Sequence, residues 1–375
     1  MVKKPVKLIL ISFLLSALLL GGCWDVQDIE ERNIATLVAL DKTEDGYRFF
    51  VEFAEPSGGG SESAGGSKYV YHQGKGKNFA EARAALDNKA KNPIYLGAVN
   101  AVVVTKRMAY YGIKEYMYRL REINDYRKVV DIFVIDCEPE ELALLGKGET
   151  SVGKTIEDTM KTLVKSGGRM YDRSNLGFIL ESLASPCKSF LLPCVSIKEN
   201  SIAVAGFYVF NDGVCVGVLG AEESWGMQLF NQKKSERYYT APIGGDEATV
   251  RLALKKKKVE PSFENGRIGF LISVEFYAVL AYVTEEIEFD AQLTEELKRN
   301  LEHRIAEDIA RAVYDSQKVY RTDYMSFCIP FRIKYPVEFR EMDWHGAFPD
   351  ADITIEVAVN LDVEGEPDFI PQYEF

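Results

Sequence analysis

The sequence has little histidine and little cysteine, which limits the metal chemistry open to it. Only three histidines occur among 375 residues, and the six cysteines include no CxxC pair. Zinc sites are built mainly from these two residue types at short spacings. The composition leaves almost no material for a zinc site, and we expect no metal or other cofactor.

The chain also lacks an excess of positive charge. Its 45 lysines and arginines are outnumbered by 57 aspartates and glutamates, which gives a formal net charge of −12. Nucleic acids and anionic lipid surfaces attract basic proteins. The balance therefore argues against binding to nucleic acid and against attachment to a membrane by charge alone.

Long hydrophobic runs are lacking after the first 20 residues. Residues 8–20 form one apolar run behind a basic start, and this run is too short to span a bilayer comfortably. The residues Gly21-Gly22-Cys23 directly after it resemble the lipobox of bacterial lipoproteins. We expect residues 1–22 to be a signal peptide and Cys23 to carry the lipid, since two or three acyl chains anchor a protein stably. The alternative is an ordinary signal peptide followed by an incidental cysteine.

The other five cysteines cannot all pair within one chain, because their number is odd. They are Cys137, Cys187, Cys194, Cys215 and Cys328. We expect most of them to be buried thiols that pack as small hydrophobic residues. Cys187 and Cys194 flank an apolar turn, which leaves a disulfide between them as an alternative.

Segments typical of strands and of helices follow one another along the chain, which indicates an α+β fold. A stretch rich in glycine and serine at 57–67 predicts a mobile loop, and Asp212-Gly213 predicts a tight hairpin. Aliphatic residues every four positions predict a long helix with one buried face over 291–318. The other expected helices are 78–92, 106–122, 139–145, 155–165, 175–183 and 223–230, and the expected strands are 34–41, 47–55, 69–72, 95–105, 129–135, 195–198, 202–210, 214–220, 248–259, 268–283 and 353–363.

Several conspicuous residues have plain structural interpretations. We expect Trp225 to be a core aromatic, with a binding anchor as the alternative. The lysines at 255–258 sit at a predicted strand end and indicate a solvated edge that discourages strand pairing. Glu295 and Arg299, at i,i+4 on the long helix, form a solvated pair and not a catalytic group.

Residues 148–155 satisfy the GxxxxGK[ST] pattern of a nucleotide phosphate loop. Such a loop needs a strand that runs directly into its first glycine, whereas residues 138–145 have the pattern of a helix. Glu149 would also repel the phosphate that the loop should hold. We therefore expect a connecting loop here and no bound nucleotide.

Two sets of residues carry a resemblance to a known family. At the start they are Gly22-Cys23-Trp24-Asp25 and the acidic Asp41 that closes the first strand, and at the end they are Gln317, Asp323, Phe327, Pro336, Asp343, Trp344 and Phe348. In both regions the sequence resembles the C-subunit lipoproteins of spore germinant receptors, the Ger(x)C family.

The resemblance implies an elongated lipoprotein of about three α+β domains with antiparallel or mixed sheets, which we place at residues 23–147, 148–235 and 236–375. It implies a position on the outer face of the inner spore membrane, beside membrane-embedded A and B subunits. It implies no enzymatic activity and no nucleotide. The preferred interpretation is a subunit that acts by contact with its partners and does not itself bind the germinant.

Two other classes of protein stay open. A substrate-binding lipoprotein of a transporter would show regular βα alternation and two lobes around a cleft, whereas hairpins are frequent in this sequence. An extracytoplasmic enzyme would gather titratable residues in a pocket. In the sequence, no nucleophile has a base at a recognisable spacing.

Overall fold

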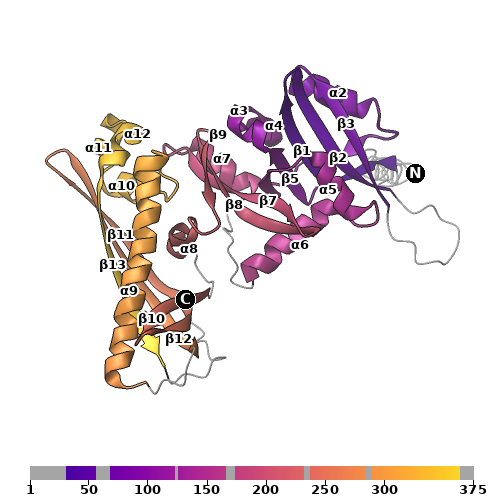
Figure 1. The fold of residues 1–375 in the computed structure, drawn as a ribbon. Helices are drawn as coiled ribbons and strands as arrows, with labels where there is room; N and C mark the ends of the chain where they lie inside the picture. The colour runs from indigo at the N-terminus through magenta and orange to yellow at the C-terminus, as the bar shows by residue number, and fades with distance from the viewer. Residues whose placement is uncertain are drawn as a thin grey trace, which may run out of the picture.

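The computed structural model describes residues 31–55, 68–122, 126–165, 174–231, 237–283 and 289–363. The predicted signal peptide, Cys23 and the predicted loop at 57–67 lie outside these ranges. The described residues form helices and two separate sheets (Figure 1), which confirms the predicted α+β class.

The first sheet has nine strands in the order β3-β2-β1-β5-β6-β7-β8-β9, with β4 paired to β1. The central strands β1, β5, β6 and β7 are parallel, and antiparallel strands extend the sheet on both sides. The strands are β1 (Asn33–Thr43), β2 (Gly46–Glu55), β3 (Lys68–Gly76), β4 (Ile94–Tyr95), β5 (Ala101–Thr105), β6 (Asp131–Ile135), β7 (Ser189–Lys198), β8 (Ser201–Asn211) and β9 (Val214–Gly220).

The domain boundary placed after residue 147 falls between β6 and β7, which are neighbours in this one sheet. Only two residue pairs join these strands, Val134 with Cys194 and Ile135 with Val195. A division of the chain at this point stays a prediction. We refer to the nine-stranded sheet with its helices as the N-terminal unit.

Helices cover both faces of this sheet. Buried residues of α2, α3, α4 and α7 share one hydrophobic core with one face, and those of α5 and α6 share another core with the opposite face. The helices are α2 (Phe79–Asp87), α3 (Lys106–Tyr111), α4 (Lys114–Glu122), α5 (Pro139–Gly146), α6 (Val152–Lys165) and α7 (Leu176–Ala184).

Glycine conformation accounts for one difference from the sequence prediction. The helix expected over 106–122 is two helices, because Gly112 has a φ of 124°, where α3 ends. The strand expected over 95–105 is likewise divided into β4 and β5. The predicted hairpin turn is confirmed, since Asp212 and Gly213 have φ values of 47° and 83° and join β8 to β9.

The second sheet belongs to the C-terminal unit and has the order β10-β11-β12-β13, with β13 parallel to β12. The predicted long helix is confirmed as α9 (Ala291–Tyr314), and its residues Leu297, Leu301, Ile305 and Ile309 are fully buried. The strands are β10 (Arg237–Ile243), β11 (Asp246–Glu264), β12 (Arg267–Val283) and β13 (Asp352–Asp362).

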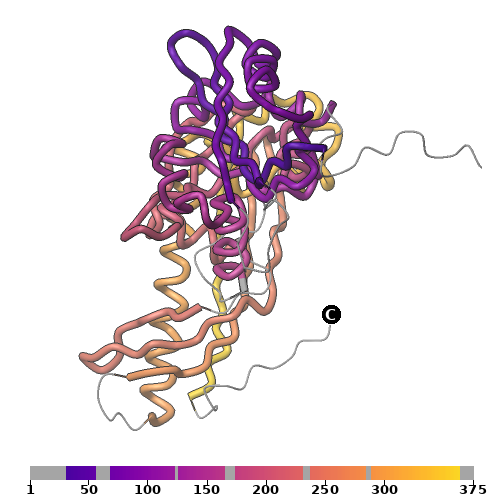
Figure 2. The backbone as a smooth tube through the Cα atoms, turned by 90° about the vertical axis from the view of Figure 1, so that its right-hand side faces the viewer, coloured from indigo at the N-terminus to yellow at the C-terminus, as the bar shows by residue number. Residues whose placement is uncertain are grey.

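Short helices close one end of the C-terminal unit, and the unit packs against the first sheet. Buried residues of β7, β8 and β9 share its core, together with α8. In Figure 2, α9 and the strands of the second sheet extend away from the N-terminal unit, so the described molecule is elongated. The short elements are α8 (Trp225–Asn231), a π-helical turn (Asp315–Val319), α10 (Cys328–Lys334), α11 (Pro336–Glu341), α12 (Trp344–Ala347) and a 3-10 turn (Phe348–Asp350).

The conspicuous residues of the C-terminal half have mostly structural roles. Trp225 is partly buried against the core and stacks on Tyr239, with ring centres 6.2 Å apart. The lysines at 255–258 lie within β11 and not at a strand end, which corrects the prediction. The pairing of β10 with β11 ends at Leu252, so the lysines have no partner from β10 beside them. They are exposed and lie on an edge of the described sheet. On α9, Glu295 pairs with Lys298 at 3.5 Å.

Candidate functional sites

The predicted lipid attachment residue, Cys23, lies outside the described part of the chain, which begins at Glu31. The eight residue steps from Cys23 to Glu31 can span at most about 28 Å at roughly 3.5 Å per residue. A lipid on Cys23 would therefore hold this end of the N-terminal unit close to the membrane. Within the described ranges, no helix combines the length and the apolar composition that a membrane crossing requires.

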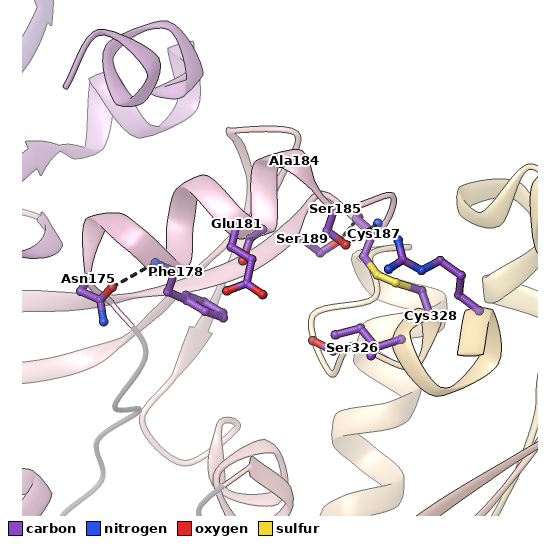
Figure 3. A pocket seen from close by; sticks show the side chains of 12 residues that line it. Asn175, Phe178, Glu181, Ala184, Ser185, Cys187, Ser189, Ser326 and Cys328 are labelled. Carbon is purple, nitrogen blue, oxygen red and sulfur yellow. Dashed lines mark hydrogen bonds between the residues drawn. A yellow bond between two sulfur atoms is a disulfide. The ribbon is translucent and has the colours of Figure 1, made fainter. Parts of the chain in front are cut away.

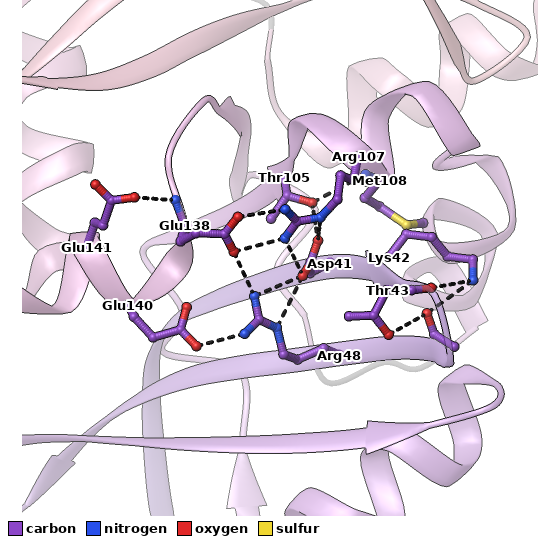
Figure 4. Close-up of polar contacts among 11 residues, drawn as sticks. Asp41, Lys42, Thr43, Arg48, Thr105, Arg107, Met108, Glu138, Glu140 and Glu141 are labelled. Atoms are coloured by element: carbon purple, nitrogen blue, oxygen red, sulfur yellow. Dashed lines mark hydrogen bonds and ion pairs between the residues drawn. The ribbon is translucent and has the colours of Figure 1, made fainter.

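Charged side chains gather at the carboxyl ends of three parallel strands (Figure 4). Asp41 lies near the end of β1, Thr105 ends β5, and Glu138 follows β6 directly before α5. In open α/β sheets, ligands commonly bind beyond the carboxyl ends of the strands. A ligand site in this fold is therefore expected at this edge.

Asp41 is fully buried at the base of this cluster and accepts hydrogen bonds from three side chains. Arg48 donates to its Oδ2 from Nε at 3.2 Å and from Nη2 at 2.9 Å. Arg107 donates to both carboxylate oxygens, at 3.1 and 2.9 Å, and the hydroxyl of Thr105 donates to Oδ1 at 2.5 Å. Both arginines also donate to Glu138, at distances of 2.6 to 3.1 Å.

These contacts keep the carboxylates of the cluster ionised. Burial acts to raise the pKa of Asp41, but the hydrogen bonds from Arg107 and Thr105 and the charge of Arg48 outweigh it and lower that pKa below its ordinary value. The hydrogen bond from Arg107 also lowers the pKa of Glu138. The cluster therefore fastens β1, β2, α3 and α5 to one another. The sequence had indicated Asp41 only through the family resemblance.

The phosphate-loop pattern at 148–155 leads into α6. Its backbone N–H groups already bind a side-chain carboxylate of the same chain. The N–H groups of Val152 and Gly153 donate to the carboxylate of Glu52 at 2.8 and 3.3 Å, and the hydroxyl of Ser151 donates to it at 2.6 Å. Glu52 is fully buried on β2. Helix N-termini favour anions, and here the side chain of Glu52 lies where a phosphate would bind.

Two further features explain this motif by packing. The element before it is the helix α5, as the sequence predicted, and not a strand. A Cβ atom on Gly153 would collide with the backbone carbonyl of Thr36, so glycine allows α6 to approach β1 closely. Sequence reasoning missed Glu52, although a lone acid in the apolar run Phe49-Phe50-Val51-Glu52-Phe53 was a usable signal.

A disulfide between Cys187 and Cys328 joins the two units (Figure 3), with Cα atoms 6.0 Å apart and a sequence separation of 141 residues. The alternative of a disulfide between Cys187 and Cys194 is therefore wrong. Cys194 and Cys215 are buried free thiols and Cys137 is a partly buried one, so the expectation that most of the five cysteines are buried thiols is wrong. Burial raises the pKa of Cys194 to about 12, so this thiol stays protonated and unreactive near neutral pH.

The carboxylate of Asp323 lies beside this disulfide and is 1% exposed. It accepts hydrogen bonds from the backbone N–H groups of Phe327 at 2.8 Å and Cys328 at 2.7 Å, and from the indole Nε1 of Trp344 at 3.2 Å. Burial outweighs these bonds and raises the pKa of Asp323 to about 7. Ligand atoms of Cys187, Asp323 and Cys328 lie within 4.8 Å of one another, but the sulfur atoms are bonded together, so the group does not offer three free metal ligands.

Two clefts share Arg332, and the disulfide lines the first of them. The first, of about 780 Å³, lies between α7 and the start of α10 (Figure 3) and is lined by several serines together with Glu181 and Arg332. The second, of about 640 Å³, also includes Arg332 and is lined by Lys188, Arg340 and Trp344. Hydroxyl groups, charged side chains and aromatic surface suit recognition of a partner or ligand. The disulfide sulfurs are not available as nucleophiles.

Both halves of the chain match known protein families. Residues 25–197 match the family described as the spore germination protein N-terminal domain. Residues 205–365 match the family described as spore germination B3/GerAC like, C-terminal. The two matches correspond to almost all of the described chain.

Individual relatives agree with this assignment. Spore germination protein B3 of Bacillus subtilis (strain 168) is 21% identical over 369 residues, which cover 96% of this chain and 98% of that protein. Spore germination protein KC of the same organism is 21% identical over 365 residues, with 89% of each chain covered. The crystal structure of the GerBC protein has a TM-score of 0.57 at 17% identity, over 86% of this chain and 96% of that one, which shows a shared fold.

These matches confirm the family resemblance that residues at both ends of the sequence indicated. The chain belongs to the Ger(x)C family of spore germination proteins.

Proposed function

We propose that the chain is the C subunit of a nutrient germinant receptor, needed for the assembly or signalling of that receptor in spore germination. The observation that carries the proposal is the match of both units, in order and over nearly the full length, to spore germination proteins. A match to only one unit would leave the role of the other unexplained.

The subunit acts by contact and not by catalysis. In the N-terminal unit, the buried Asp41 is neutralised by arginines from its own chain. The anion position before α6 is held by Glu52. Because these polar groups satisfy one another, they support a rigid body that presents its surface to partners. The partners are the membrane-embedded A and B subunits.

The attachment to the membrane is a lipid on Cys23, on the outer face of the inner spore membrane. The short apolar run and the Gly21-Gly22-Cys23 sequence support this, and the net charge of −12 makes acyl chains a better anchor than electrostatic attraction. Metabolic labelling with a fatty acid tests it. The wild-type chain should incorporate the label and the Cys23→Ala variant should not. A wild-type chain that partitions into the membrane without label would refute the anchor.

A transporter-type substrate-binding lipoprotein is the other candidate, and the cleft lined by Glu181 and Arg332 is the feature that favours it. Against it, the first sheet is extended by antiparallel strands on both sides, and the second sheet has mainly antiparallel pairs. Two lobes of regular βα alternation would be expected of such a protein.

Deletion tests the proposed function directly. Spores that lack the chain should respond poorly to the nutrients sensed by its own receptor and should germinate normally through other receptors. In a strain with this receptor as its only one, unaltered germination after the deletion would remove the assignment.

A further inference from the structure

The outer side of the helix pair α10 and α11 mixes aliphatic side chains with arginines. Ile329, Ile333 and Val337 are 50%, 74% and 52% exposed. Arg332 and Arg340 are exposed among them. Steps of three or four residues place side chains on the same side of a helix, which groups, in chain order, the first three of these positions on α10 and the last two on α11. We call these five residues the α10–α11 face.

Two clefts meet at Arg332 and connect residues of both helices. Ile329 and Arg332 line the first cleft, and Arg332 and Arg340 line the second. Part of the face therefore borders two hollows of about 780 and 640 Å³, while Ile333 and Val337 lie outside the lining of both. Single exposed apolar residues are normal on a protein, whereas several of them together with a polar rim mark an interaction site.

The charge of the second cleft is opposite to that of the whole chain. Lys188, Arg332 and Arg340 line it with one carboxylate, that of Asp343, although the chain has a net charge of −12. Among the residues that the structure describes, neither Arg332 nor Arg340 forms an ion pair, and Arg340 donates only to the carbonyl of Pro336, at 3.1 Å. Two guanidinium groups are therefore available to a partner.

The support beneath the face is rigid. The disulfide fixes Cys328 at the start of α10, and Asp323 accepts hydrogen bonds from the first backbone amides of that helix. The rings of Phe331 and Phe339 pack on Trp344, with centres 5.3 and 5.5 Å apart. A surface that is already ordered loses little entropy when a partner binds.

We propose that the α10–α11 face binds a protein segment that carries carboxylates beside aliphatic side chains. This rests on the proposed function, under which the segment belongs to another subunit of the same receptor. Carboxylates form strong paired hydrogen bonds with guanidinium groups, and aliphatic side chains would cover Ile333 and Val337. A flat lipid surface would touch the exposed residues but would not fill the two clefts, which favours a protein segment as the occupant.

Site-specific photocrosslinking in the intact membrane tests the face. A photoreactive amino acid replaces Ile333 in the full-length chain, and the control replaces Leu144 of α5, which is equally exposed at 74%. The expected result is a crosslink from position 333 to an acidic segment of another receptor subunit, and none from position 144. Crosslinks only to lipid, crosslinks only to a second copy of the chain, or no crosslink at all would each overturn the proposal.

Charge reversal provides the second readout. Arg332→Glu with Arg340→Glu should reduce the crosslink from position 333 at least about tenfold, as expected when central arginines of an interface are lost. The matched control is Lys256→Glu with Arg267→Glu, two exposed cations on β11 and β12, which should leave the yield unchanged. Thermal unfolding of both variants checks that they fold. Equal losses in the two folded variants would contradict the proposal.

The deletion strain separates this inference from the function on which it rests. If deletion of the chain abolishes the response and spores with the charge-reversal variant germinate normally, the proposed role of the α10–α11 face is wrong and the subunit assignment stands. If deletion has no effect, the assignment itself has failed, whatever the crosslinks show.

Discussion

Each of the two units contains a buried aspartate, and the two aspartates are surrounded in opposite ways. Asp41 of the N-terminal unit is held by two guanidinium groups, and its pKa lies below the ordinary value. Asp323 of the C-terminal unit is held by neutral N–H donors from its described surroundings, and burial raises its pKa to about 7. The neutral N–H donors around Asp323 therefore do not offset its burial, whereas Arg107, Thr105 and Arg48 together do so for Asp41.

The two aspartates accordingly have different structural roles in their units. The ion cluster around Asp41 joins strands and helices within the N-terminal unit, to which the predicted anchor is attached. Asp323 instead fixes the start of α10 beside the disulfide, and so supports the face that we assign to the partner.

The largest loss of unfolding free energy should come from removing the Asp41 carboxylate, which Arg48 and Arg107 share. Asp41→Ala would leave Arg48, whose side chain is 11% exposed, without its buried partner. Breaking such a pair costs about 3–5 kcal/mol of unfolding free energy, which urea denaturation measures. The control is Glu140→Gln, which removes a half-exposed partner of the same arginine and should cost less than about 1 kcal/mol. Equal losses of unfolding free energy in the two variants would contradict the claim that the buried Asp41 stabilises the unit more than the half-exposed Glu140.

Removal of the disulfide between the units should cause the next largest loss of unfolding free energy. Replacing Cys187 and Cys328 together by serine removes the crosslink and should lower the unfolding free energy by about 2–5 kcal/mol, since a long loop is closed by it. The control is Cys194→Ser, a buried thiol with no disulfide. If the double variant were as stable as the wild type, the disulfide would not be what holds the units together.

A third effect should appear as a dependence of stability on pH, with a smaller change for each pH unit. Asp323 has a folded-state pKa of about 7, above the ordinary value near 4. The folded chain therefore keeps a proton that the unfolded chain releases, and stability should fall as the pH rises from about 4 to about 7, by about 1 kcal/mol per pH unit. Asp41 should act oppositely, because its lowered pKa makes stability fall as the pH drops below about 4.

The variant Asp323→Asn separates the two contributions. It cannot titrate, so the change in stability between pH 4 and pH 7 should be lost while the decline below pH 4 persists. Urea denaturation at a series of pH values gives both slopes. A wild-type chain whose stability rises steadily from pH 4 to pH 7 would show that Asp323 is ionised at a normal pKa.

Local patterns of the sequence predicted much of the fold. The four-residue repeat of aliphatic residues identified α9, and Asp212-Gly213 identified the hairpin. Contacts between distant residues could not be read in this way. The partner of Cys187 is 141 residues away, and Glu52 meets the N–H group of Val152 from 100 residues away.

The same limit explains what the sequence missed about the candidate sites. Asp41 was noticed, but Arg107 and Glu138 join it only because parallel strands bring their ends together. The lysines at 255–258 were placed at a strand end, since nothing local showed that β11 continues to Glu264. The α10–α11 face depends on which side of each helix the core covers, and that is a property of the assembled fold.

The claim that this subunit acts by contact is tested most directly by calorimetric titration of the lipid-free chain with the amino acids and sugars that trigger the spores. The account predicts no saturable heat for any of them, while crosslinking in membranes joins the chain to the A and B subunits. Saturable binding of a germinant that is abolished by Glu181→Ala with Arg332→Ala, in the cleft of about 780 Å³, would contradict it and make this chain the sensor.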